Sequence, residues 1–127
     1  MRAEDITAPA GSVTLGGKPY PTRYDHEQIR QTEMAWQALT MRPMGYLGIL
    51  MQAQRGVYTA LCALCYGAIA SGQKRAGVAV DKRLTLLQFD RIAEYRQLLA
   101  VQASLLEDAL RAMDDGQKKK TQPEQGG

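Results

Sequence analysis

The sequence predicts a mainly α-helical fold with a short N-terminal antiparallel β-hairpin packed on a small helical bundle, in the α+β class. Two glycines between β-prone runs predict the hairpin, apolar residues at three- and four-residue spacing predict helices, and a long apolar stretch predicts a buried central helix. A chain of 127 residues can bury about two-thirds of its unfolded surface. We expect a flexible segment at residues 1–10, one domain at 11–115 and a disordered tail at 116–127.

The hairpin is predicted by the stretch SVTLGGKPYPT. Glycines at residues 16–17 suit a two-residue turn, and closing the strands there pairs Leu15 with Lys18. In that register Pro19 and Pro21 fall where the N–H groups would point away from the partner strand, so the ladder loses no hydrogen bond. The prolines remove donors from the outer edge of their strand, so a third strand or a second copy of the chain cannot easily add there.

Two amphipathic helices are expected after the hairpin. The first covers residues 25–40, where Asp25 can cap the first turn and the Gln28 side chain can bond back to it. A break at Arg42 and Pro43 separates this helix from a short second helix over residues 44–54.

The second half of the chain begins with a buried helix over residues 57–70. A loop containing Gly72 is expected to start after Ile69. Thr85 then caps a new helix, with a glutamine three residues later, and apolar residues recur on one face as far as Asp114. This pattern leaves open whether the last segment is one helix or two, and Gly116 is expected to end it.

Three features of the chain indicate the cellular compartment of the protein. The apolar stretch GVYTALCALCYGAIA is shorter than the roughly 20 residues that a bilayer-spanning helix needs, so a buried helix is favoured over a membrane span. The first residues contain acids and a proline but no apolar run, unlike a secretory signal. The net charge of +3 implies no strong polyanionic partner. We expect a cytosolic protein without a membrane partner.

Candidate chemistry is sparse. Cys62 and Cys65 form a CxxC motif, but apolar residues flank it and the chain has one histidine, His26, so packing is favoured over a redox or zinc role. His26 follows a helix cap, and no nucleophile signature accompanies it. We therefore expect a protein that is not an enzyme, with no catalytic residue, metal site or cofactor.

Methionines gather in one region. Four of them, including Met34, fall within eighteen residues at the end of the first helix and in the second. Methionine fills irregular gaps in cores and also suits surfaces that accept varied apolar partners. The alternative is that the buried helix covers this face completely. The residues predicted to bind a partner are Met41, Met44, Tyr46, Leu47 and Met51.

Residues 12 to about 113 resemble the tail assembly chaperones of long-tailed bacteriophages and of related gene transfer agents. The resemblance is carried by the start VTLGGKPYPTRYDHEQI, by Glu33 near the middle of the first helix, by the apolar helix YTALCALCYGAIA and by RLTLLQFDRIAEY before the last helix. It implies a non-enzymatic protein of the host cytoplasm that keeps the tape measure protein soluble while major tail proteins polymerise around it. The major tail tube protein and a second copy of the chain are further candidate partners.

The main alternative is a small basic helical module that binds nucleic acid, or another phage-encoded protein-interaction module. Its basic residues lie in predicted loops and a tail, without a recognition helix or interleaved aromatics, so nucleic acid is the less favoured partner. These residues are Lys74, Arg75, Lys82, Arg83 and Lys118 to Lys120.

Overall fold

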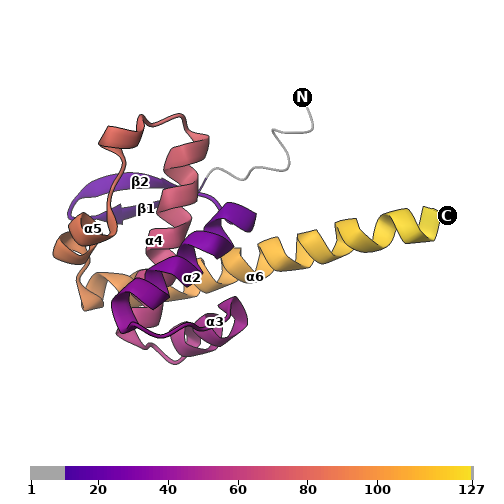
Figure 1. Ribbon diagram of the computed structural model, residues 1–127, viewed down its shortest axis with the longest axis horizontal. Helices are drawn as coiled ribbons and strands as arrows, with labels where there is room; N and C mark the ends of the chain where they lie inside the picture. Colours follow the sequence, from indigo (N-terminus) through magenta and orange to yellow (C-terminus); the bar gives the residue numbers. More distant parts are fainter. Residues whose placement is uncertain (1–10, 127) are drawn as a thin grey trace.

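The structure is a computed structural model that describes the backbone of residues 11–126 and the side chains of residues 11–115. It confirms the predicted class, because a two-stranded hairpin precedes a set of α-helices (Figure 1). The segment at residues 1–10, predicted to be flexible, lies outside the described residues. The elements in chain order are β1 (Gly11–Leu15), β2 (Lys18–Thr22), α2 (His26–Thr40), α3 (Tyr46–Gln54), α4 (Tyr58–Arg75), a 3-10 turn (Val80–Lys82), α5 (Leu86–Ile92) and α6 (Tyr95–Gly126).

The hairpin has the predicted register. Leu15 pairs with Lys18, and the two prolines lie opposite Thr14 and Ser12. Both turn glycines have positive φ, which a two-residue hairpin turn requires at its two central positions. The alternation of the pleat buries one face of the hairpin, and this face packs into the core. The buried members of this face are Val13, Leu15, Tyr20 and Thr22.

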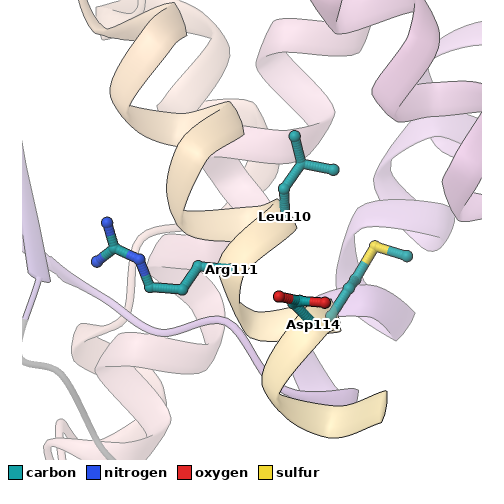
Figure 2. A pocket seen from close by; sticks show the side chains of 4 residues that line it. Leu110, Arg111 and Asp114 are labelled. Atoms are coloured by element: carbon teal, nitrogen blue, oxygen red, sulfur yellow. The ribbon is translucent and has the colours of Figure 1, made fainter. Parts of the chain in front are cut away.

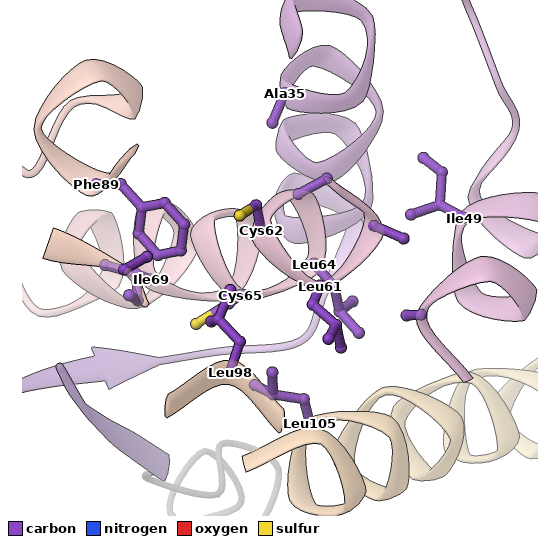
Figure 3. Close-up of a cluster of buried hydrophobic side chains, with 14 of the residues drawn as sticks. Ala35, Ile49, Leu61, Cys62, Leu64, Cys65, Ile69, Phe89, Leu98 and Leu105 are labelled. Carbon is purple, nitrogen blue, oxygen red and sulfur yellow. The ribbon is translucent and has the colours of Figure 1, made fainter. Parts of the chain in front are cut away.

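The core is built around α4, which Figure 1 shows in the centre of the fold and Figure 3 shows surrounded by apolar side chains. Helix α4 contacts α2, α3, α5, α6 and the second strand. Such a helix needs apolar side chains on all sides, which explains the long uninterrupted stretch in the sequence. Its larger side chains with no exposed surface are Leu61, Leu64, Cys65 and Ile69.

Helix α4 is longer than predicted. It continues through Gly72 to Arg75, so the loop expected after Ile69 starts six residues later. Gly72 is needed there because a Cβ atom would overlap the carbonyl oxygen of Pro21 in β2. Gly67 has the same role against α2, where a Cβ atom would overlap Oγ1 of Thr32. These glycines permit close approach between backbones and do not end the helix.

Helix α2 begins as predicted but its capping box is incomplete. Oδ1 of Asp25 accepts a hydrogen bond from the Gln28 backbone N–H at 2.9 Å. The Gln28 side chain does not bond back to the cap. It is buried instead and its amide nitrogen donates to Oγ1 of Thr32 at 3.1 Å and to the hydroxyl of Tyr46 at 3.0 Å. The hydroxyl of Ser71, in α4, donates a further hydrogen bond to Oδ1 of the capping residue Asp25 at 2.7 Å.

The last segment is two helices. Thr85 and Gln88 form the complete capping box at the start of α5, and the chain leaves helical geometry at Ala93 before α6 starts. The Tyr58 hydroxyl donates to the Ala93 carbonyl at 3.2 Å, which attaches this break to the start of α4. The hydroxyl of Tyr95 donates to the Gly56 carbonyl at 2.6 Å, a second attachment on the same side.

The predicted end of the last helix at Gly116 is corrected by the structure, while the predicted disorder of residues 116–127 stays a prediction. The backbone of α6 stays helical to Gly126, and its C-terminal part extends beyond the other helices (Figure 1). Residues 117–120 are glutamine and lysine, which are good helix formers, and the single glycine before them costs a helix only about 1 kcal/mol, so the helix can pass Gly116.

Candidate partner-binding surface

The five residues predicted to bind a partner lie in different environments. Met41, Leu47 and Met51 are exposed, with 84%, 62% and 59% of their surface accessible. Met44 is half-buried and packs against the edge of the core. The prediction that Tyr46 lies on this surface is wrong, because its side chain is 7% exposed and belongs to the core.

Tyr46 is held in the core by α2. The Gln28 side chain bonds to its hydroxyl, and the carboxylate of Glu33 accepts its backbone N–H at 2.9 Å. Burial raises the pKa of the Tyr46 hydroxyl to about 12, although the hydrogen bond with Gln28 opposes this effect. Both contacts lie at the N-terminal end of α3 and join it to α2. Helix α3 is therefore fixed in its orientation although it has only nine residues.

The opposite side of α3 faces solvent. Its buried side consists of Tyr46, Ile49, Leu50 and Ala53. Leu47 and Met51 are four residues apart and therefore lie one turn above each other on the other side of the helix. Met44 precedes α3, and its side chain lies over Gly48 of that helix. A Cβ atom added to Gly48 would be 3.0 Å from Cγ of Met44. Three large apolar side chains thus line one exposed flank of α3.

A groove between α2 and the segment that connects it to α3 adjoins this flank. It has a volume of about 450 Å³. Met34 of α2, which is 54% exposed, and Met44 supply its apolar part. Its other lining residues are Arg30, Glu33, Gln37, Pro43 and Gly45. We name Met34, Met41, Met44, Leu47 and Met51 the methionine surface.

The sequence did not identify Met34, Gln28 and Glu33 as parts of this region. Met34 belongs to the methionine cluster of the sequence, so its spacing from the others was a usable signal. Gln28 and Glu33 act through contacts with Tyr46, which is 18 and 13 residues away, and no local pattern predicts such a contact.

The CxxC motif has no feature of a reactive site. Both cysteines are free and buried in the core around α4 (Figure 3). Burial raises the pKa of the Cys62 thiol to about 11 and that of the Cys65 thiol to about 12. Thiols with such pKa values are protonated near neutral pH and are poor nucleophiles and poor metal ligands.

A second concavity lies on α6 and is lined, among the described side chains, by one helix (Figure 2). Its volume is about 580 Å³, and its lining residues are Leu110, Arg111, Met113 and Asp114. Figure 2 shows Leu110 and Arg111 projecting to different sides of the helix. Arg111 donates to Glu107 at 2.6 Å, one turn earlier. An Arg–Glu pair four residues apart is a common stabilising contact on exposed helices. It does not bring catalytic or ligand-binding groups together.

Part of the basic cluster makes internal contacts. Nζ of Lys74 lies 3.4 Å from the carboxylate of Glu27, and Nε of Arg83 donates to the Val78 carbonyl at 2.8 Å. The hydrogen bond from Gln31 is the main cause that lowers the pKa of Glu27 to about 2; desolvation opposes it, and contacts with Arg30 and Lys74 support it. Lys74 thus joins the end of α4 to α2, and Arg83 makes a contact within the loop that follows α4.

The described residues contain no group of three or more His, Cys, Asp or Glu side chains that could hold a metal ion. None of the helices in this part of the chain combines the length and apolarity needed to cross a bilayer. A scan against protein-family models, a search of curated proteins and a search of solved structures each found no match to this chain.

Proposed function

We propose that this protein is a non-enzymatic tail assembly chaperone of the host cytoplasm that binds an apolar segment of the tape measure protein on the methionine surface. The resemblance over residues 12 to about 113 supports this function, and one structural observation supports the site. Leu47 and Met51 stay largely exposed on a helix whose other side is fixed in the core by Tyr46. Exposed apolar side chains that gather on one face often mark a protein interaction site.

The chemistry of the methionine surface suits a helical client. Methionine side chains are unbranched and polarisable, so they adjust to apolar groups of different shape. The exposed flank of α3 and the adjoining groove could receive apolar side chains at helical spacing, as in helix-in-groove recognition. Arg30, Glu33 and Gln37 supply a polar border beside Met34. A site of this composition holds a client by burial of apolar surface, which also allows its later release.

The proposal predicts a tape measure protein gene beside the gene of this chain, and co-expression of the two proteins tests it. The test variant carries Leu47→Ser with Met51→Ser, and both positions are exposed, so the domain should remain folded. We expect the wild-type chain to keep the tape measure protein soluble and to co-purify with it. The double variant should lose at least about tenfold of the recovered partner, because it removes both exposed apolar side chains that α3 contributes to the surface.

A matched control is Leu87→Ser in α5. Leu87 is 66% exposed, so this change removes a similar apolar group from another part of the domain. Recovery of the partner should equal that of the wild type. Equal recovery with the double variant, confirmed as folded by circular dichroism, would show that the methionine surface is not the binding site. Failure of the wild-type chain to bind or dissolve the tape measure protein would contradict the proposed function itself.

A further inference from the structure

The two edges of the hairpin differ in their capacity to accept another strand. In the observed register, the N–H and C=O groups of residues 12 and 14 in β1, and of residues 19 and 21 in β2, point away from the partner strand. In β2 both positions are prolines, so this edge offers no N–H donor. Helix α4 also lies against it, since Gly72 contacts the carbonyl of Pro21 and the Arg23 N–H donates to the Ala68 carbonyl at 3.0 Å. The β2 edge is closed.

Within residues 11–126, the β1 edge has none of these protections. Ser12 and Thr14 are exposed, and within residues 11–126 their N–H groups have no hydrogen-bond partner. Among the described elements, β2 is the one that packs along β1. The strand GSVTL contains no proline, no charged residue and no bulge. Natural edge strands usually carry at least one such feature, which prevents pairing with another chain.

We propose that two copies of this chain pair through their β1 strands, antiparallel and with the two-fold axis at Val13. Ser12 of each copy then lies opposite Thr14 of the other, and the two outward N–H groups of each strand donate to the outward carbonyls of the other. The β1 edge is separate from the methionine surface, and pairing through it does not depend on the proposed function.

Two properties of β1 indicate that its partner is the β1 strand of a second copy: its edge is self-complementary and it carries no charge. The free donors and acceptors at residues 12 and 14 are repeated with the same spacing in a two-fold related copy, so every one of them is satisfied. The strand is uncharged, so two copies do not repel one another when they lie side by side. The resulting four-stranded sheet has the order β2, β1, β1, β2. Its two outer edges carry the prolines, so growth stops at two copies.

The test measures the mass of the full chain by sedimentation equilibrium over a range of concentrations. We expect a dimer that dissociates on dilution. Thr14→Pro removes one outward donor per chain and leaves the hairpin ladder intact, as the prolines of β2 already do in the wild-type chain. We expect this variant to weaken the dimer at least about tenfold, since each dimer loses two hydrogen bonds. The control Thr14→Val keeps the N–H group and should dimerise like the wild type.

Three results would overturn the proposal: a wild-type chain that is monomeric at all concentrations, a dimer that Thr14→Pro leaves unchanged, or a dimer that Thr14→Val weakens equally. Amide hydrogen exchange provides a measurement without substitutions, should Thr14→Pro fail to fold. Protection of the Ser12 and Thr14 amides should rise with protein concentration in the wild-type chain. Protection that is absent, or that does not depend on concentration, would contradict pairing between copies.

Discussion

At the scale of single residues, neighbouring positions in α3 have opposite roles. Tyr46 and Leu47 are adjacent, yet one is buried and hydrogen-bonded to Gln28 and the other is exposed to solvent. The sequence predicted the short helix and its apolar character but not which side faces the core. Both sides carry large apolar residues at helical spacing, so periodicity alone could not separate them. The deciding contact comes from α2, 18 residues earlier in the chain.

This difference predicts unequal stability effects of two similar changes. Tyr46→Ser should reduce the free energy of unfolding by about 3–5 kcal/mol, because it leaves a cavity in the core and removes the partner of the Gln28 amide. Leu47→Ser should change it by less than about 1 kcal/mol. Urea denaturation followed by circular dichroism measures both values. Losses of similar size for the two variants would contradict the assigned environments.

Asp25 predicts a specific dependence of stability on pH. Partial desolvation acts to raise its pKa, but hydrogen bonds from Ser71, the Gln28 N–H and Arg23 outweigh this effect and hold the pKa below its ordinary value. A carboxylate with a lowered pKa in the folded state contributes stability above its unfolded pKa of about 3.9. That contribution is lost as the pH falls below about 4 and through the folded pKa.

The comparison is with Asp25→Asn, which keeps an oxygen acceptor at the cap but cannot titrate. Between about pH 5 and pH 2, the wild-type chain should lose more stability than the variant, as measured by thermal unfolding at each pH. If the two chains lose the same amount over this interval, the carboxylate of Asp25 does not stabilise the start of α2 through its charge.

At the scale of elements, the interior of α4 shows what a single sequence reveals about helix boundaries. Gly72 looked like the start of a loop because glycine lowers helix propensity. In the structure it lies inside α4, where the helix backbone touches β2. The sequence predicted the strand and the buried helix separately. It could not predict that they approach so closely that a side chain is excluded, because this contact joins residues 51 positions apart.

Gly72→Ala tests this contact, because propensity and packing predict opposite signs. Propensity alone predicts a gain of about 1 kcal/mol for alanine in a helix interior. Overlap with the carbonyl of Pro21 predicts a net loss of about 1–3 kcal/mol, since α4 must move away from β2. Denaturant unfolding measures the change. Gly45→Ala is the control, because its Cβ position is open, and the cost there should be less than about 1 kcal/mol. A stabilised Gly72→Ala variant would contradict the close approach.

At the scale of the whole molecule, most of the architecture could be predicted from local patterns. The hairpin turn, its register, the cap at Asp25 and the central buried helix follow from residues close together in sequence, and the structure confirms them. The exact members of the methionine surface could not be predicted. They depend on how α2 orients α3, through contacts between Tyr46 and side chains of another helix.

The arrangement separates a rigid part from an exposed part. Helix α4 and its surrounding core stabilise the domain, while one flank of α3 is left in solvent with large apolar side chains. The hairpin lies on α4 and does not contribute to this flank. A domain of this kind can hold a client without a change of its own fold, which suits the role proposed for the methionine surface.

Site-specific photo-crosslinking tests the central claim most directly. A photoreactive phenylalanine analogue replaces Leu47 in one variant and Leu87 in another, and each is irradiated in the presence of the tape measure protein. Both positions are exposed on helices, so the two probes are equally accessible. The methionine surface as binding site predicts a strong crosslink from position 47 and a weak one or none from position 87. A crosslink from position 87 alone, or equal yields from both positions, would contradict it.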